Sequence, residues 1–172
     1  RVMSNSFSNV GINDRLVKAL EIQDITVPTE IQVKSIPELI FGKDFIGCSE
    51  TGSGKTLAYL LPLLMKIDVE KRSNQAIILA PTHELAMQIF KEIEKLVNGS
   101  EIKVTSAQCI GGANIYRQTD KLKKKPHIIV GSAGRILELI KTKKIDPAVK
   151  TLIIDEADRM LDDDNFETLL RL

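Results

Sequence analysis

Short apolar runs alternate along the chain with longer segments in which apolar residues recur every three or four positions. The short runs are apolar at successive positions, which is typical of strands that are covered on both faces. We predict strands over 44–48, 75–80, 102–109, 127–131 and 149–155. We predict helices over 13–23, 29–40, 55–67, 83–97, 114–124 and 133–142, with Thr29 as the N-cap of the second.

This alternation predicts an α/β fold, in which an open, mainly parallel sheet carries helices on both faces. We expect a single domain over 1–172, with a helical lead-in over 1–42 and a core over 43–172. A content of 43% hydrophobic and 27% charged residues suits a globular chain. The 24 basic and 23 acidic residues nearly balance, so only local clusters of charge can indicate a partner.

Two lysine runs are such clusters: KLKKK over 121–125 and KTKK over 141–144. They could attract RNA, but we interpret them as solvated helix faces or helix ends. Cys48 and Cys109 lack a ligand-like spacing and are interpreted as small buried residues in a reducing compartment. No apolar run reaches membrane length and no signal-peptide pattern is present, so we expect no membrane partner and a cytoplasmic location, or a nuclear one in a eukaryote.

The segment CSETGSGKT, residues 48–56, joins a predicted strand to a predicted helix. It matches the phosphate-loop pattern G-x-x-x-x-G-K-[ST] except at its first position, where a small side chain replaces glycine. Backbone N–H groups of such a loop, with the positive end of the following helix, surround phosphate oxygens. We predict that Lys55 reaches the β- and γ-phosphates and that Thr56 takes part in a Mg²⁺ site. The residues expected at the nucleotide are Ser49, Glu50, Thr51, Gly52, Ser53, Gly54, Lys55 and Thr56.

Two adjacent carboxylates end the last apolar run, in TLIIDEADRML. Asp155 would lie at the same sheet edge as the loop and help to hold Mg²⁺, while Glu156 would orient and deprotonate the attacking water. The alternative is a strand end followed by acidic residues that cap a helix. The phosphate loop favours the first interpretation.

The sequence Asp155-Glu156-Ala157-Asp158 and the phosphate-loop segment are typical of one family: the chain resembles the first RecA-like domain of DEAD-box RNA helicases. The resemblance covers nearly the whole length. The family loop has the sequence A-x-T-G-S-G-K-T, in which a small residue replaces the first glycine. Ser49 is therefore similar to the residue usual at this position in the family. The resemblance implies an ATP-dependent RNA helicase that uses ATP and Mg²⁺, and it gives Asp158 a role in coupling ATP state to RNA.

The resemblance extends to the adenine-reading Q motif, with Phe7 packing over the site and Pro28 and Gln32 in the run VPTEIQ. A side-chain amide can bond adenine N6 and N7 together, whereas guanine presents an acceptor in place of one donor. Asp24-Ile25 replaces the family's usual Gly-Phe. Without the resemblance, Gln32 would be interpreted as an exposed helical residue.

Three further segments resemble the motifs that grip the backbone of single-stranded RNA: PTHE over 81–84, GG over 111–112 and SAGR over 132–135. Glycines there allow close backbone approach, while hydroxyl and guanidinium groups supply donors. His83 replaces an arginine and Ala133 replaces a proline, which would loosen the loop, so we expect weaker RNA binding than is usual in the family. The alternative for Thr82 and Ser132 is helix capping. The residues expected at single-stranded or duplex RNA are Pro81, Thr82, His83, Glu84, Gly111, Gly112, Ser132, Gly134 and Arg135.

The resemblance also implies elements that follow Leu172 in the family: an S-A-T motif and a second RecA-like domain with an arginine finger. In the family the S-A-T strand lies between the phosphate-loop strand and the DEAD strand. We therefore expect a central gap in the sheet, and either a longer polypeptide or a strand-swapped dimer that fills it.

Two other functions stay open. A GTPase would need N/T-K-x-D, which TKKID at 142–146 misses by one residue. A non-catalytic RNA-binding scaffold would keep the fold with a decayed ATPase site, and the presence of Lys55, Thr56, Asp155 and Glu156 argues against it.

Overall fold

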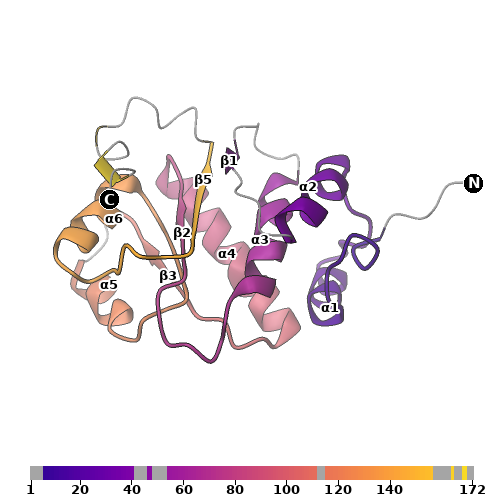
Figure 1. Cartoon of the computed structure of the whole chain (residues 1–172), viewed down its shortest axis with the longest axis horizontal. Coiled ribbons are helices and arrows are strands. Elements are labelled where there is room, and N and C mark those ends of the chain that lie inside the picture. Colours follow the sequence, from indigo (N-terminus) through magenta and orange to yellow (C-terminus); the bar gives the residue numbers. More distant parts are fainter. Residues whose placement is uncertain are drawn as a thin grey trace, which may run out of the picture. The chain divides into compact units, whose positions relative to one another are not determined.

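The computed structural model describes residues 6–40, 46–47, 54–111, 115–156, 164 and 168–169. Its contacts define two compact units. The first consists of residues 1–45, 49–67 and 92–103, and the second of residues 46–48, 68–91 and 104–172. The order of the elements along the chain can be followed in Figure 1.

The first unit is helical. It contains α1 (Asp14–Ile22), α2 (Glu30–Ile40), α3 (Lys55–Lys66) and the end of α4 (His83–Ser100), which starts in the second unit. Helix α2 packs along α3. The end of α4 approaches α1 so closely that a Cβ on Gly99 would lie 2.9 Å from the Cα of Ala19. These contacts place the start of α2 and the start of α3 together, where the predicted phosphate loop ends.

Helix α1 shows why its sequence forms a helix of this length. The Asn13 side chain accepts a hydrogen bond from the Leu16 N–H at 3.0 Å and caps the first turn. At the other end, Ile25 N–H donates to the Leu20 carbonyl and Asp24 N–H donates to the Glu21 carbonyl. This is a Schellman termination, and Asp24 sits at its left-handed position with φ 60°. The aspartate thus stands where the family's glycine would.

The second unit is built on one parallel sheet with the strand order β1-β5-β2-β4-β3. The strands are β1 (Ile46–Gly47), β2 (Ala76–Leu79), β3 (Ser106–Cys109), β4 (Ile128–Gly131) and β5 (Thr151–Asp155). The predicted α/β fold with a parallel sheet is confirmed. The predicted start of the third strand at 102 is wrong, because α4 continues to Ser100 and the chain turns at Glu101 with φ 58° before it reaches the sheet.

Both faces of β2 and β4 are buried, as their apolar runs predict. Helices α5 (Ile115–Leu122) and α6 (Ala133–Lys141) share a core with one face of the sheet, whose buried members include Ile77, Leu79, Ala107, Ile129, Ile136 and Leu139. Gly131 is needed where β4 meets β3, because a Cβ there would overlap the Cys109 carbonyl oxygen. Within the described ranges, no helix combines the length and apolar character needed to cross a bilayer.

The expected central gap in the sheet is wrong. Strand β1 pairs directly with β5, with Ile46 opposite Ile154 and Gly47 opposite Asp155. Because backbone groups of β5 find partners on both sides, the sheet gives no argument for a strand-swapped dimer.

Candidate nucleotide and RNA sites

Gly54, at the end of the predicted phosphate loop, begins the part of that segment that the structure describes. Gly54 is the N-cap of α3 and has φ 81°. A Cβ on Gly54 would lie 2.7 Å from Gln32 Nε2 and 2.8 Å from Thr29 Oγ1, so no other residue fits without displacement. Lys55 follows with only 3% of its surface exposed, and Thr56 is half-buried. Because Gly54 has no side chain to cap α3, the first N–H groups of that helix can face an anion. Ser49, Glu50, Thr51, Gly52 and Ser53 lie outside the described residues.

Gln32 is buried, 2% exposed, which contradicts the alternative of an exposed helical residue. Its side-chain Oε1 accepts from Thr29 N–H at 2.8 Å, and its Nε2 donates to the Gly54 carbonyl at 3.0 Å. In return, Gln32 N–H donates to Thr29 Oγ1 at 3.4 Å. This reciprocal capping box confirms Thr29 as the N-cap of α2 and fixes the amide beside the end of the phosphate loop.

The Gln32 amide does not use all of its hydrogen-bonding groups in the two side-chain bonds described. An amide has two N–H donors and a carbonyl oxygen with two lone pairs, and the two side-chain bonds described use one donor and one lone pair. Phe7 and Pro28 are both buried in the first unit, and Phe7 is a core residue there.

Asp155 and Glu156 lie at the carboxyl end of β5 in the second unit. They are 1% and 8% exposed, and Glu156 has φ 51°, a left-handed conformation that is uncommon for a residue with a side chain. Backbone strain of this kind is concentrated at functional sites. Asp155 is in register with Gly47, and the phosphate loop begins directly after Cys48. Asp158 lies outside the described residues.

Magnesium held together with a nucleotide needs few protein ligands. Among the described residues, no group of three or more His, Cys, Asp or Glu side chains could hold a metal ion alone. Mg²⁺ usually keeps several waters and takes one or two carboxylates besides substrate phosphates. The buried Asp155 carboxylate of the second unit is the kind of donor that such a shell uses.

The segments expected at RNA come together at the carboxyl ends of β2, β3 and β4. Thr82 caps α4, because its Oγ1 accepts from Leu85 N–H at 3.1 Å. Ser132 has the position of a cap for α6, but its hydroxyl makes no capping hydrogen bond. His83 lies next to Gly111, since a Cβ on that glycine would be 3.7 Å from His83 Nε2. Pro81, Gly134 and Arg135 are half-buried, Glu84 is exposed in the first turn of α4, and Gly112 lies outside the described residues.

Gln118 connects two of these segments, although no motif in the sequence singles it out. This buried side chain on α5 donates to the Ile110 carbonyl at 2.9 Å and accepts from Arg135 Nη1 at 2.9 Å. Arg135 also pairs with Glu138 at 3.1 Å. The guanidinium and the turn before Gly111 are therefore held by one amide. A polar residue six positions after Gly112 is the only signal that could have pointed to it.

Ala133 does not loosen a loop, so that inference is wrong. It is buried and is the first residue of α6, where proline is also well tolerated because the N–H there needs no helical partner. Ser132 has φ −84° and ψ 152°, which is also the conformation required before a proline. Alanine in this place keeps the helix start that a proline would give.

Burial raises the pKa of the Cys109 thiol to about 12, although Arg135 and Lys121 partly oppose the shift. Cys109 is buried at the end of β3, which confirms its interpretation as a small core residue. Cys48 lies outside the described residues. His127 lies directly before β4, which begins at Ile128 and not at His127 as predicted. Its ring joins the Thr105 N–H to the Lys71 carbonyl at 3.0 Å each, a structural role.

The fold and the carboxyl-edge residues define the class as an α/β domain of the RecA-like type. A crystal structure of a DEAD box protein from the hyperthermophile Methanococcus jannaschii superposes with a TM-score of 0.88 and 34% identity, over 96% of this chain and 46% of that one. The DEAD/DEAH box helicase family pattern matches residues 29–172, and the chain belongs to that family.

Curated relatives agree with this family. The chain is 54% identical to the DEAD-box ATP-dependent RNA helicase CshC of Bacillus cereus, over 77% of the chain and 34% of the relative. It is 48% identical to the probable ATP-dependent RNA helicase YfmL of Bacillus subtilis, over 84% of the chain and 38% of the relative. The chain thus spans only about a third of the length of these relatives.

Proposed function

We propose that the chain is the nucleotide-binding half of an ATP-dependent RNA helicase. The observation that carries the proposal is the buried Asp155-Glu156 pair at the end of β5, in register with the strand from which the phosphate loop leaves. The left-handed backbone at Glu156 and the glycine-only start of α3 at Gly54 support it, because both are costly features that a mere connector does not require.

Each residue has a definite role in this proposal. Lys55 binds the β- and γ-phosphates, and Thr56 and Asp155 hold Mg²⁺, largely through water. Mg²⁺ neutralises charge on the phosphates when bound. Glu156 accepts a proton from water while the water oxygen bonds to the γ-phosphorus and the bond to the bridging oxygen breaks, which yields ADP and phosphate. Gln32 reads adenine with the donor and lone pair that its capping bonds leave over.

RNA would lie along Thr82, His83, Gly111, Ser132 and Arg135, held by phosphates and sugars and not by base edges. The clustering of these residues at the carboxyl ends of β2, β3 and β4 supports this part of the proposal. Hydrolysis and RNA remodelling would need a second RecA-like domain to supply an arginine finger. The chain alone should therefore bind nucleotide and hydrolyse it poorly.

Calorimetric titration with ADP and with GDP, each with Mg²⁺, tests the nucleotide site. We expect ADP to bind and GDP not to bind, and we expect Gln32→Ala to weaken the affinity for ADP at least tenfold. Thr29→Ala is the matched control, because it removes the cap on Gln32 N–H and keeps the amide. Equal losses in both variants would show that Gln32 acts only through the capping box. Equal binding of ADP and GDP would disprove the adenine-reading role.

If the wild-type chain binds neither nucleotide, the proposal of an ATPase half fails and the RNA-binding scaffold with a decayed site takes its place. Titration with single-stranded RNA then decides whether the scaffold function holds. The cytoplasmic location remains a prediction, which fractionation of cells that express the protein would test.

A further inference from the structure

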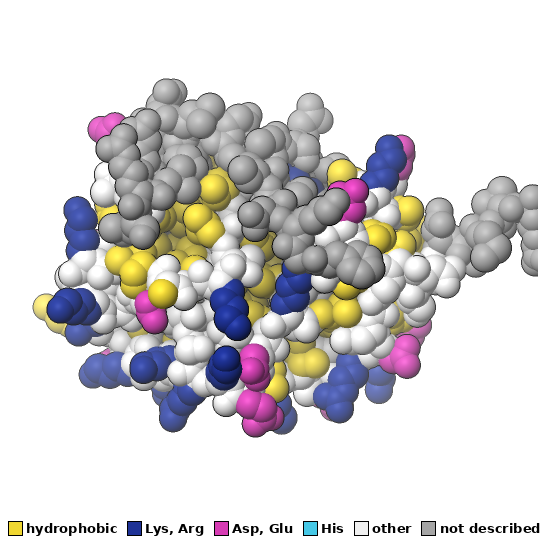
Figure 2. Space-filling model, viewed as in Figure 1, with side chains coloured by type: hydrophobic (Ala, Val, Ile, Leu, Met, Phe, Trp, Pro, Cys, Tyr) yellow, Lys and Arg dark blue, Asp and Glu magenta, His cyan; other side chains and the backbone are white. Residues whose placement is uncertain are grey.

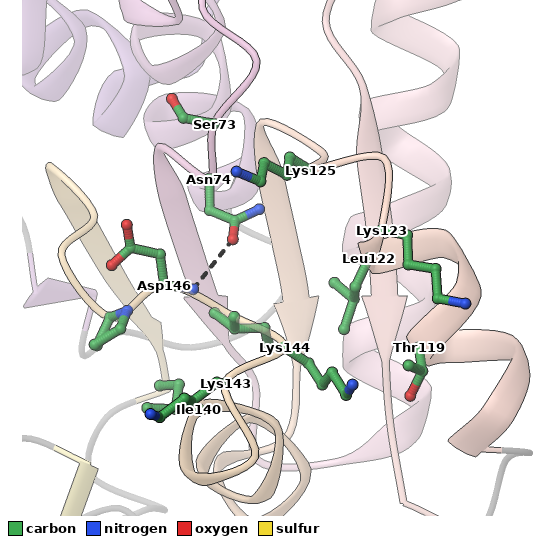
Figure 3. A pocket seen from close by; sticks show the side chains of 12 residues that line it. Ser73, Asn74, Thr119, Leu122, Lys123, Lys125, Ile140, Lys143, Lys144 and Asp146 are labelled. Carbon is green, nitrogen blue, oxygen red and sulfur yellow. Dashed lines mark hydrogen bonds between the residues drawn. The ribbon is translucent and has the colours of Figure 1, made fainter.

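A pocket of about 630 Å³ lies in the second unit at the amino ends of β2, β4 and β5, the opposite edge of the sheet from Asp155. Four lysines line it, two after α5 and two after α6: Lys123, Lys125, Lys143 and Lys144. Leu122 and Ile145, both buried, form an apolar floor. Figure 3 shows Lys125 pointing toward Asn74 and Lys144 pointing toward Thr119. The two lysine runs of the sequence thus meet around one hollow.

The walls of this lysine pocket are fixed by hydrogen bonds. The Asn74 side chain donates to the Pro126 carbonyl at 2.8 Å and accepts from Asp146 N–H at 3.2 Å. One amide therefore ties the loop after α5 to the loop after α6, as the dashed line in Figure 3 partly shows. Arg72 adds a bond from its Nε to the Lys124 carbonyl at 3.4 Å. The lysines are presented by a preorganised backbone, and ordering that backbone costs nothing further when a ligand binds.

The charges around the pocket are poorly compensated. Asp146 is the single acidic residue of the lining. Lys123 pairs with Asp120 at 3.3 Å in an exposed contact, which contributes little. Within the described part of the chain, Lys125, Lys143 and Lys144 are paired with no carboxylate. Figure 2 shows Lys and Arg side chains gathered along the lower left edge of the view, where few acidic side chains lie.

Two of the lysines occupy backbone conformations that favour glycine. Lys125 has φ 51° and Lys143 has φ 59°. Lys143 is at the left-handed position of a Schellman termination of α6, where its N–H donates to the Ile140 carbonyl and Lys144 N–H donates to the Leu139 carbonyl. The negative end of a helix favours nearby cations, which explains exposed lysines in the last turn. It does not explain lysine at the two positions where the side chain itself causes strain.

We propose that the lysine pocket is a second RNA site, which holds the phosphate backbone of a single-stranded segment. It lies apart from the carboxyl-edge track, by which we mean the expected RNA segments 81–84, 111–112 and 132–135. Lysine ammonium groups bind phosphates as point charges, so the site would hold the RNA backbone without reading its bases. The proposal rests on RNA being the substrate of the protein. A four-residue strand spans only about 13 Å, so one RNA strand of several nucleotides can reach both edges of the sheet.

Fluorescence anisotropy with labelled single-stranded oligouridine at several salt concentrations tests the site. The double substitution Lys125→Gly/Lys143→Gly removes two charges and relieves two strained positions, so lost binding cannot result from unfolding. We expect about tenfold weaker binding and a salt slope reduced by about 1.4, since each phosphate contact contributes about 0.7 for single strands. The matched control is Lys91→Ala/Lys95→Ala, two exposed lysines of α4, with binding within twofold of wild type. Equal losses in both pairs would overturn the proposal.

Lys144→Gln gives a second variant at a position outside the left-handed region, with an expected loss of about threefold. Photo-crosslinking of thiouridine RNA, followed by peptide mapping, separates the two sites. Crosslinks within 121–125 or 141–147 support the lysine pocket, even if 81–84 and 132–135 remain unlabelled and the track fails. Crosslinks at 81–84 and 132–135 without any at the lysine pocket would overturn the proposal. Competition by an acidic peptide as strong as that of RNA with equal charge would instead identify a protein-binding surface and also overturn it.

Discussion

Asp24 has a strained backbone conformation that the hydrogen bonds of neighbouring residues impose on it. The Schellman termination of α1 holds it at φ 60°, where an L side chain is strained by roughly 1 kcal/mol and glycine is not. We expect Asp24→Gly to raise the free energy of unfolding by about 0.5–1 kcal/mol, measured from urea denaturation. Asp24→Ala should lower it, because alanine tolerates this conformation less well than aspartate. A glycine variant less stable than the alanine variant would contradict this account.

Cys109 makes a prediction about pH. Its pKa of about 12 in the folded chain exceeds the ordinary value of 9.0, so the unfolded chain loses the proton first as pH rises. The stability that the buried neutral thiol contributes is complete below about pH 9 and is lost between about pH 9 and 12. Denaturation midpoints should therefore fall more steeply over this range in the wild type than in Cys109→Ala. Native Cys109 should also resist iodoacetamide at pH 8 and react in urea, which peptide mapping would measure.

At the scale of elements, apolar periodicity located the strands β1 to β5 and the helices α1 to α6, because the spacing of apolar residues along a segment shows which of its faces is buried. All five strands and all six helices overlap their predicted ranges. Side-chain contacts between segments far apart in the sequence could not be predicted from apolar periodicity. Without the family resemblance, Gln32 would be interpreted as exposed, because its partner Gly54 is 22 positions away in the sequence. Gln118 was missed because its partners, Ile110 and Arg135, belong to other elements.

Gln118 leads to a prediction for helix α5 as a support for the expected RNA track. Gln118→Leu removes the bonds to the Ile110 carbonyl and to Arg135, leaving buried polar groups without these partners. We expect a loss of about 1–2 kcal/mol in stability and severalfold weaker RNA binding, with ADP affinity unchanged. Gln118→Glu keeps an acceptor for Arg135 and should recover part of the RNA affinity. If both variants bound RNA as tightly as the wild type, the amide would be a structural link only.

At the scale of the whole chain, the proposed chemistry and the proposed RNA contacts belong to different strands of one sheet. Asp155 ends β5 and Glu156 follows it, and β5 lies between β1 and β2, whereas the RNA segments follow β2, β4 and β3. Hydrolysis and RNA binding should therefore be separable by substitution. Glu156→Gln keeps the size of the side chain and removes the base, so we expect hydrolysis stimulated by RNA in the full-length protein to fall at least a hundredfold. Binding of ADP and of RNA should stay within twofold of wild type.

Asp155→Asn is the partner experiment, since Asp155 is proposed to act on Mg²⁺ and not on water. Replacing the carboxylate with a neutral amide should reduce the Mg²⁺ dependence of ADP binding, measured by titration with and without the metal, while RNA binding persists. Wild-type hydrolysis by Glu156→Gln would exclude the carboxylate as the base. Unchanged Mg²⁺ dependence in Asp155→Asn would remove Asp155 from the metal shell. The two substitutions together thus test whether adjacent carboxylates at the carboxyl end of β5 have distinct roles.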